Sequence, residues 1–442
     1  MPSTTANQGF SLSRYIQQVE RVDTTPLSGR VVRTVGLLIE SQGPRVPVGA
    51  LCEVVGGARA AAITVQIVGF RDGLVLAVPL GDTVGVQPGD RLVARGRAQD
   101  IGVGQALLGR VIDAMGQPLD GGGPIAVEQC YPIHPPPLNP MDRDPVVAPL
   151  ASGVRAIDAL LTCGRGQRIG LFGGSGVGKS TLLGMLTRGT AADIIVVALV
   201  GERGREVRGF IEHDLGTEGL KRAVVVASTS DSPPLLRLRA AYSATSIAEY
   251  FRDQGLNVLL LMDSVTRFAT AQREVGLAAG EPPTTKGYPP SVFALLPTLL
   301  ERAGAVRGRG SITALYTVLV EGDDHNEPIA DSVRAILDGH IVLSRELAAR
   351  YHYPPIDVLQ SVSRTMPDVT AVGHRQQAAQ VREWMAAIRD SEDLVSVGAY
   401  VPGSNPKIDT ARAKAEAIRA FLCQEADTLC GFTDAVQALG AL

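Results

Sequence analysis

The feature of the sequence that most constrains the fold is a glycine-rich octapeptide at residues 173–180, GGSGVGKS, which matches the pattern G-x-x-x-x-G-K-S/T in full. It follows the apolar run RIGLF and precedes TLLGMLTR, which is the strand, loop and helix context that a phosphate-binding loop needs. Glycines let backbone amides curl around phosphate oxygens, and the start of a helix adds partial positive charge. The octapeptide therefore predicts a nucleotide-phosphate site.

Two side chains of this loop have specific expected contacts. Lys179, one of only five lysines among 42 basic residues, is expected to reach the outer phosphates. The hydroxyl of Ser180 is expected to ligate Mg²⁺. The residues of the loop expected to contact the nucleotide are Gly173, Gly174, Ser175, Gly176, Val177, Gly178, Lys179, Ser180 and Thr181.

Two acidic residues end apolar runs that are typical of buried strands. Asp263 follows VLLLM, and Glu202 follows ALVG. Ligands of open α/β sheets bind at the carboxyl ends of strands, so Asp263 is a candidate magnesium carboxylate and Glu202 a candidate for polarising an attacking water. The alternatives are a turn-capping role for Asp263 and, for Glu202, a surface ion pair with Arg203 or Arg205.

Composition limits the class of protein. The 442 residues suggest about three domains, and the balance of 42 basic and 45 acidic residues excludes a polycationic nucleic-acid arm and an acidic tail. Five cysteines without a C-x-x-C pair fit neither a disulfide framework nor a zinc site and favour a reducing compartment. There is no signal-peptide pattern, and the apolar run 194–200 is too short to span a bilayer. We expect a soluble cytosolic protein.

The amino-acid composition changes twice within the first third of the chain. Residues 1–24 are polar and mixed, whereas 27–97 hold short β-rich runs separated by Gly, Pro and Asp, which predict a small β-barrel or sandwich. Residues 116–149 are dense in Gly and Pro and are expected to run along a surface.

The remainder alternates between strand and helix patterns. Five apolar runs (RIGLFG, IIVVALV, RAVVVAS, NVLLLMD and SITALYTVLV) are typical of a parallel sheet covered on both faces. An amphipathic helix is predicted from Pro234, because proline is tolerated in a first helical turn. After Pro367 an Ala-, Arg- and Glu-rich stretch predicts a small helical domain. The segment 272–293, rich in Glu, Pro, Gly and Thr, is expected to be a long functional loop.

Several long blocks resemble the export ATPases of bacterial type III secretion, which serve the flagellum and the virulence injectisome and are similar to the catalytic subunits of rotary ATP synthases. The resemblance covers roughly residues 25–442. The blocks are GLFGGSGVGKSTLLGML, VALVGERGREVRGFI, LLLMDSVTRFATAQREVGLAAGEPPTTKGYPPSVF, TVLVEGDDHNEPIADSVRAILDGHIVLSR and YPPIDVLQSVSRTMP.

The resemblance implies an α/β fold in which a RecA-like P-loop domain lies between an N-terminal small β-barrel and a C-terminal helical domain, assembled as a homohexamer. The expected divisions are a partner-binding segment (1–24), the barrel (25–98), the RecA-like ATPase domain with its linker 116–149 (99–365) and the helical domain (366–442). The segment 272–293 is expected to face the central pore.

The resemblance also implies roles for particular residues. Arg364 of SVSR matches an arginine finger donated to a neighbour's site, although spacing alone does not distinguish it from the 36 other arginines. Tyr353 of HYPPID matches a tyrosine that stacks on adenine, and no second aromatic is found at residues 425–426. The implied catalytic residues are Lys179, Glu202, Arg203 and Arg364, and the implied metal ligands are Ser180 and Asp263.

The function implied is an ATP- and Mg²⁺-dependent motor of type III protein export, flagellar favoured over injectisome, that couples hydrolysis to chaperone release, unfolding and export of protein substrates. Expected partners are a stator-like regulator at the N-terminal segment, a stalk-like coiled coil in the pore, membrane proteins of the export gate, and chaperone–substrate complexes. Nucleic acid is not expected. The expected location is the cytoplasm, peripherally associated with the inner-membrane export gate.

Three other functions remain as alternatives. A rotary ATP synthase subunit is disfavoured by the short C-terminal domain of about 75 residues and by the export-type blocks. A non-catalytic ring subunit would keep the phosphate loop but lack the catalytic carboxylate. The presence of Glu202 argues against this alternative. A hexameric nucleic-acid translocase would use the barrel as an OB-fold, but residues 1–99 carry a net charge of only +3 and three aromatic residues, which gives little surface for base stacking.

Overall fold

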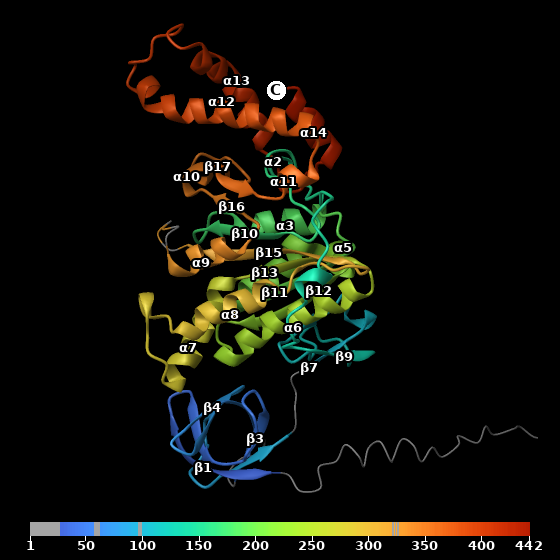
Figure 1. The fold of residues 1–442 in the computed structure, drawn as a ribbon, viewed down its shortest axis with the longest axis vertical. Coiled ribbons are helices and arrows are strands. Elements are labelled where there is room, and N and C mark those ends of the chain that lie inside the picture. The colour runs from blue at the N-terminus through green and yellow to red at the C-terminus, as the bar shows by residue number, and fades with distance from the viewer. Residues whose placement is uncertain (1–26, 57–61, 96–99, 321, 323, 325–326) are drawn as a thin grey trace, which may run out of the picture. The chain divides into compact units, whose positions relative to one another are not determined.

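The computed structural model describes residues 27–56, 62–95, 100–320, 322, 324 and 327–442 (Figure 1). The chain forms two compact units, 1–98 and 99–442, which are described separately here. The expected partner-binding segment 1–24 lies outside the described residues.

The first unit contains a closed six-stranded antiparallel barrel, so the sequence prediction of a barrel or sandwich resolves to a barrel. Alternating side chains of its strands fill the interior, as Val65 and Ile67 do on β4. Asp72 and Gly73 both have positive φ and form the tight turn between β4 and β5. In barrel order the strands are β1 (Ser28–Val35), β2 (Leu38–Gln42), β5 (Leu74–Pro79), β4 (Ile63–Arg71), β3 (Leu51–Val55) and β6 (Arg91–Ala94).

The second unit is built on one large sheet, and the five apolar runs predicted as strands are its five central parallel strands. β16 extends the sheet in parallel beside β10, whereas β17 and β14 are antiparallel additions. The order is β17 (Ile356–Ser363), β16 (Gly339–Leu343), β10 (Arg168–Gly173), β15 (Ser311–Leu319), β13 (Asn257–Asp263), β11 (Ile194–Glu202), β12 (Ala223–Thr229) and β8 (Val111–Ile112), with β14 (Gly304–Ala305) paired to β15.

Helices cover both faces of this sheet, which explains why its strands are apolar throughout. On β13, Leu259 and Leu261 belong to the core cluster that includes residues of α3, whereas the buried Leu260 and Met262 alternate with them toward the other face. Figure 1 shows α3 above β13 and β11, and α6, α7 and α8 below them. The helices are α2 (Arg155–Leu160), α3 (Lys179–Gly189), α4 (Gly204–Gly209), α5 (Gly216–Lys221), α6 (Pro234–Asp253), α7 (Val265–Ala279), α8 (Pro290–Leu300), α9 (Pro328–Ile336) and α10 (Arg345–Ala349).

The expectation of one long loop over residues 272–293 is wrong. α7 continues to Ala279, where Gly280 ends it in the left-handed conformation, and α8 begins at Pro290. The loop is therefore confined to 280–289. Composition misled the prediction because Val275 keeps the helical spacing of buried residues on α7 despite polar and glycine neighbours.

The Gly- and Pro-rich segment 116–149 lies along the surface of the second unit. Ile133 is its only buried residue, and the whole segment is described. Its strand β9 (Gln129–Pro132) pairs with β7 (Asp100–Val103) in a separate two-stranded sheet.

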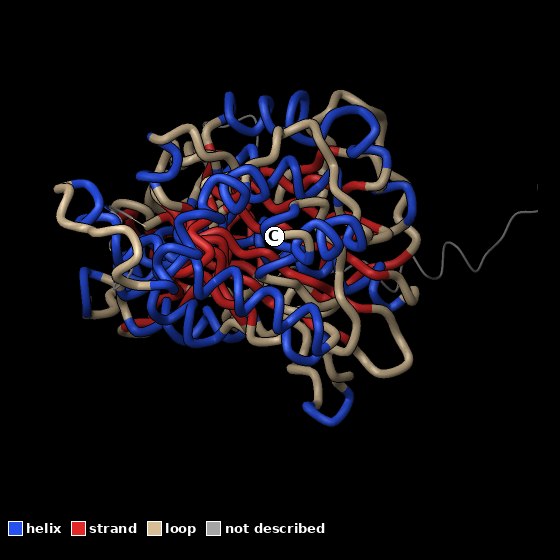
Figure 2. Tube along the Cα trace, turned by 90° about the horizontal axis from the view of Figure 1, so that it is seen from above, coloured by secondary structure: helices blue, strands red, loops and turns tan. Residues whose placement is uncertain are grey.

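The C-terminal helices form part of the second unit. α12 and α13 make an antiparallel pair, and α14 packs against α2. His374 on α12 makes a 2.7 Å hydrogen bond with the carbonyl of Ala159 in α2. Seen from above, these helices lie nearest the viewer over the strands (Figure 2). They are α11 (Met366–Val369), α12 (Val372–Ser396), α13 (Pro406–Leu422) and α14 (Phe432–Gly440).

No helix within the described ranges combines the length and the apolar content required to cross a membrane.

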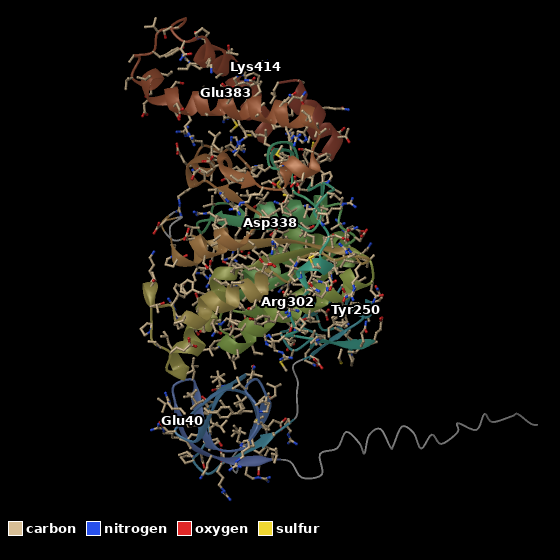
Figure 3. All side chains as sticks on the ribbon, in the orientation of Figure 1. Glu40, Tyr250, Arg302, Asp338, Glu383 and Lys414 are labelled. Carbon is tan, nitrogen blue, oxygen red and sulfur yellow. The ribbon has the colours of Figure 1, made fainter. Side chains whose placement is uncertain are left out.

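A buried arginine joins three segments of the second unit (Figure 3). Arg302, directly after α8, donates to both carboxylate oxygens of Glu249 on α6 at 2.9 and 2.6 Å. It also donates to Ser246 and to the carbonyl of Ile133 in the surface segment. The side chains of the ion pair are only 10% and 8% exposed.

Replacing Arg302 with leucine should leave Glu249 buried and unpaired, so we expect the free energy of unfolding to fall by about 3–5 kcal/mol. Urea unfolding of the full chain would measure the loss. Arg350→Leu is the matched control, because Arg350 is 57% exposed and its partners Glu346 and Glu392 are 71% and 52% exposed, so each pair should contribute under about 1 kcal/mol. Equal effects of the two variants would contradict the structural role of Arg302.

Candidate functional site

The glycine-rich loop lies at the carboxyl edge of the parallel strands, where it joins β10 to α3. Gly176 and Gly178 have φ angles of 77° and 101°, in the left-handed region that other residues rarely adopt. Gly178 stands directly before α3, so the free amides at the start of that helix open onto the loop.

Asp263 is the point at which side chains from neighbouring strands meet. Its Oδ1 accepts a 2.6 Å hydrogen bond from Lys179 Nζ and another of 2.6 Å from the hydroxyl of Thr317. Thr317 is fully buried, and Asp263 is only 6% exposed. The strand order β10-β15-β13-β11 brings Thr317, Asp263 and Glu202 together from three adjacent strands, and Lys179 joins them from the start of α3, which follows β10.

Glu202 ends β11 and is 8% exposed. Burial and the negative charge of Asp263 raise the pKa of Glu202 to about 7, although the charge of Lys179 opposes this. Glu202 Oε1 lies 4.0 Å from Arg267 Nε, and neither atom has a hydrogen-bond partner among the described residues. Because buried polar atoms are normally satisfied, this unpaired acceptor and donor are positioned for a polar ligand.

These groups line a pocket of about 400 Å³ together with the glycine-rich loop. Arg203 also borders the pocket, but its side chain is 77% exposed and lies 3.9 Å from Glu206. The alternative of a surface Glu202 paired with Arg203 or Arg205 is therefore wrong: Glu202 is buried, its ion-pair partner is Arg267 on α7, and Arg203 is paired with Glu206.

A second pocket of about 440 Å³ adjoins the glycine-rich loop. Gly178 and Thr181 line both this pocket and the first one. Tyr353 lines this pocket, and its ring atom Cε1 lies 3.6 Å from the position that a Cβ on Gly178 would occupy. The carbonyl of Tyr353 accepts a 2.9 Å hydrogen bond from the backbone of Gln424. The tyrosine thus lies beside the phosphate loop, where a base attached to bound phosphates would reach it.

Arg364 does not join these residues. It is exposed at the end of β17, which runs antiparallel to β16, so it lies at the amino edge of the parallel strands. Its N–H donates to the carbonyl of Asp338, just before β16. The six residues of β10 separate the two edges by about 20 Å, at roughly 3.3 Å per residue. Within one chain, Arg364 therefore cannot reach the glycine-rich loop.

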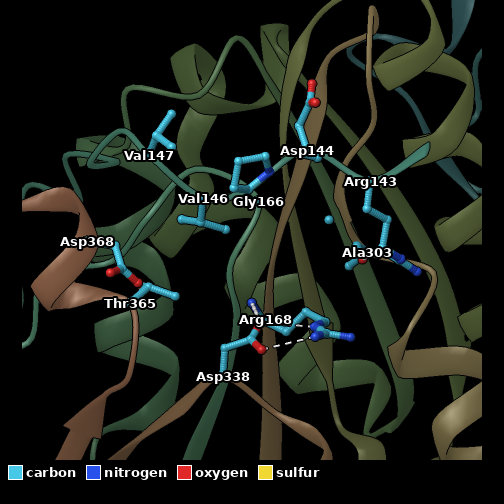
Figure 4. A pocket seen from close by; sticks show the side chains of 13 residues that line it. Arg143, Asp144, Val146, Val147, Gly166, Arg168, Ala303, Asp338, Thr365 and Asp368 are labelled. Carbon is cyan, nitrogen blue, oxygen red and sulfur yellow. Dashed lines mark hydrogen bonds and ion pairs between the residues drawn. The ribbon is translucent and has the colours of Figure 1, made fainter. Parts of the chain in front are cut away.

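A cleft of about 470 Å³ lies next to Arg364, at Thr365 and Asp338 (Figure 4). Its two arginines are already paired within the chain. Arg168 donates to both carboxylate oxygens of Asp338 at 3.0 Å, and Arg143 donates to the carbonyl of Ala303 at 2.9 Å. The cations of this cleft are thus occupied in holding the fold together.

Three residues of these pockets and their surroundings are absent from the sequence predictions. Arg267 follows Asp263 by four residues at the start of α7, and that spacing from the strand-end acid was a usable signal. Thr317 lies inside an apolar run, and Tyr351 precedes Tyr353 by two residues. Neither position has a sequence pattern that points to a site.

Family models match two parts of the chain. Residues 153–363 match the model of the ATP synthase alpha/beta family, nucleotide-binding domain. Residues 370–441 match the model of the T3SS EscN ATPase C-terminal domain.

Curated relatives match over nearly the whole chain. The flagellum-specific ATP synthase of Bacillus subtilis is 51% identical over 97% of this chain and 98% of its own length. The type 3 secretion system ATPase of Sinorhizobium fredii is 49% identical over 96% and 94%, respectively.

Solved structures agree. The assembled ATPase EscN of the enteropathogenic E. coli type III secretion system superposes with a TM-score of 0.89 at 44% identity, covering 93% of this chain and 99% of that one. EscN in complex with its central stalk EscO gives a TM-score of 0.86 over the same shares. The chain therefore belongs to the family of flagellum-specific and type III secretion ATPases, whose nucleotide-binding domain is that of the ATP synthase alpha/beta family.

Proposed function

We infer that this chain hydrolyses Mg²⁺-ATP and is the motor of a type III protein export apparatus. The observation that carries the inference is the buried Oε1 of Glu202, which accepts no hydrogen bond within the described residues and lines the same pocket as the glycine-rich loop and Lys179. The relatives that support it come from both flagellar and injectisome systems. The match of the C-terminal helices to an export ATPase model favours export over ATP synthesis.

The groups at the strand ends suit the hydrolysis of a nucleoside triphosphate. Lys179 would leave Asp263 for the outer phosphates, and the loop amides would hold the phosphate oxygens. Glu202, with a pKa near 7, would orient and deprotonate the attacking water through Oε1. Arg267 Nε would then donate to a phosphate oxygen instead of remaining unpaired.

The oxygen ligands present fit Mg²⁺. Ser180 supplies a hydroxyl and Asp263 a carboxylate, both of which line the pocket, and oxygen ligands of this kind are those that Mg²⁺ prefers. Magnesium bound there would neutralise negative charge that develops on the phosphates. Thr317, which is neutral, would keep Asp263 oriented after Lys179 has moved away.

Assembly and partners follow from the relatives as proposals. EscN is described as assembled and as bound to a central stalk, EscO. We propose that this chain forms a homohexamer with a stalk-like coiled coil in its pore. A stator-like regulator at the N-terminal segment, the export gate and chaperone–substrate complexes are the further partners proposed, at the cytoplasmic side of the inner membrane.

Glu202→Gln tests the proposed hydrolysis. Because the fold and the phosphate contacts remain, we expect ATP affinity within a few-fold of the parent and a fall in kcat of about 10²-fold or more. Glu212→Gln, an exposed carboxylate paired with Arg208, is the matched control and should keep the parental rate. A Glu202→Gln enzyme that hydrolyses ATP at the parental rate would exclude the assigned role.

Thr317→Val tests whether the buried hydroxyl positions Asp263. Losing a hydrogen bond to a charged group costs about 1.5–3 kcal/mol, so we expect activity to fall about 10–100-fold. The Mg²⁺ concentration for half-maximal activity should rise, whereas Thr317→Ser should restore it. Magnesium titration at saturating ATP measures both the maximal activity and the Mg²⁺ concentration for half-maximal activity. If Thr317→Val and the parent had the same magnesium dependence, the role of Thr317 would be limited to packing.

Mixing two inactive variants tests whether Arg364 acts on a neighbouring copy. Arg364→Ala should lose roughly 10³-fold in turnover because the arginine offsets charge that develops only in the transition state. Arg364→Lys should not rescue, since a point charge cannot replace the guanidinium fork. In rings mixed from Glu202→Gln and Arg364→Ala chains, some interfaces hold both intact groups, so activity should partly return. Mixed rings that form but stay inactive would contradict action in trans.

A further inference from the structure

Helix α10 ends in a backbone motif that usually contains glycine. The N–H of Tyr351 donates to the carbonyl of Ala348 at 3.1 Å, and the N–H of His352 donates to that of Leu347 at 3.0 Å. This pair of bonds is the Schellman motif, in which the first residue beyond the cap adopts a left-handed conformation. That residue is Tyr351, with φ of 56°. A tyrosine there is strained where a glycine would not be.

The strained tyrosine also fails to bury its ring. Tyr351 is 85% exposed, more than any other exposed large apolar or aromatic side chain within the described residues. Packing within this chain therefore does not explain why a large aromatic occupies a strained position. Strained residues that persist tend to mark functional sites.

Tyr351 lines the same pocket of about 440 Å³ as Tyr353, and the pocket adjoins the phosphate loop at Gly178 and Thr181. The polar groups of the facing C-terminal segment are largely occupied. Both ends of the Gln424 amide are bonded, the oxygen to the N–H of Arg155 and the nitrogen to the carbonyls of Gly153 and Thr428. Aromatic faces are therefore the main recognition chemistry that this pocket offers.

We propose that Tyr351 is a second aromatic wall of a base-binding pocket and stacks, together with Tyr353, on the purine base of the nucleotide. The proposal rests on the proposed function for the triphosphate site. Stacking on an aromatic side chain changes affinity for a base by about 5–100-fold. Glu425 and Ala426 line the pocket without providing a ring, so both aromatic side chains come from the segment that follows α10.

Tyr351→Gly is the decisive variant, because glycine fits the left-handed position and should not harm folding. We expect KM for ATP to rise about tenfold, within the range for one stacked base, and the midpoint of thermal unfolding to stay unchanged or to rise. Tyr351→Asn, which also tolerates this conformation, should behave like the glycine variant. Tyr351→Phe keeps the ring and should keep the parental KM.

Two comparisons separate base binding from a structural effect. Ribose 5′-triphosphate lacks the base, so its inhibition constant against ATP hydrolysis should be the same for the parent and for Tyr351→Gly. Asp72→Gly is the matched control, because Asp72 is also a non-glycine residue with positive φ, at 53°, and lies in the turn between β4 and β5 of the barrel. It should leave KM for ATP unchanged.

The proposal is overturned if Tyr351→Gly leaves KM for ATP at the parental value. It is equally overturned if the variant weakens ATP and ribose 5′-triphosphate by the same factor, since that pattern indicates a displaced phosphate loop. Failure of the proposed function would look different, because the parent itself would then neither bind nor hydrolyse ATP.

Discussion

The site depends on one carboxylate oxygen. Asp263 Oδ1 accepts hydrogen bonds of 2.6 Å from both Lys179 and Thr317. Asp263 and Thr317 lie on the adjacent strands β13 and β15, and Lys179 begins α3, which follows the neighbouring strand β10. The register of β10, β15 and β13 must be correct for these bonds to form, since a shift of one residue would turn each side chain to the opposite face. The side chains of Lys179 and Asp263 are only 12% and 8% exposed, and this low exposure strengthens the interaction.

The same sheet explains why one chain holds an incomplete set of the predicted groups. The glycine-rich loop, Asp263 and Glu202 lie at the carboxyl edge of the parallel strands, and Arg364 lies at the amino edge because β17 runs antiparallel. A rotation of side chains cannot bridge the length of β10. If Arg364 contributes to hydrolysis, the contribution goes to another copy, so assembly and activity are coupled by the strand directions of the fold.

The sequence predictions that the structure confirms rest on short sequence patterns. The octapeptide and the apolar runs each specify a conformation through short-range chemistry, so the parallel strands and the loop at their edge were predictable. Thr317 was not, because an isolated hydroxyl in an apolar run has the same pattern whether it bonds to a carboxylate or to backbone. Tyr351 was not, because its left-handed φ depends on where α10 ends. The end of α7 was misjudged because composition was weighed above helical spacing at Val275.

The electrostatics of Glu202 connect the cation to the nucleotide. Burial and Asp263 raise the pKa of Glu202 to about 7, and Lys179 is the nearby positive charge that opposes them. If Lys179 left Asp263 for a phosphate, as proposed, the two carboxylates would lose that positive charge, and Glu202 would shift toward its protonated form, which cannot accept a proton from water. A divalent cation held by Ser180 and Asp263 would restore the positive charge and keep Glu202 ionised. Under the proposed function, the cation would act both at the phosphates and in keeping Glu202 ionised, which would couple proton transfer to the arrival of the metal–nucleotide complex.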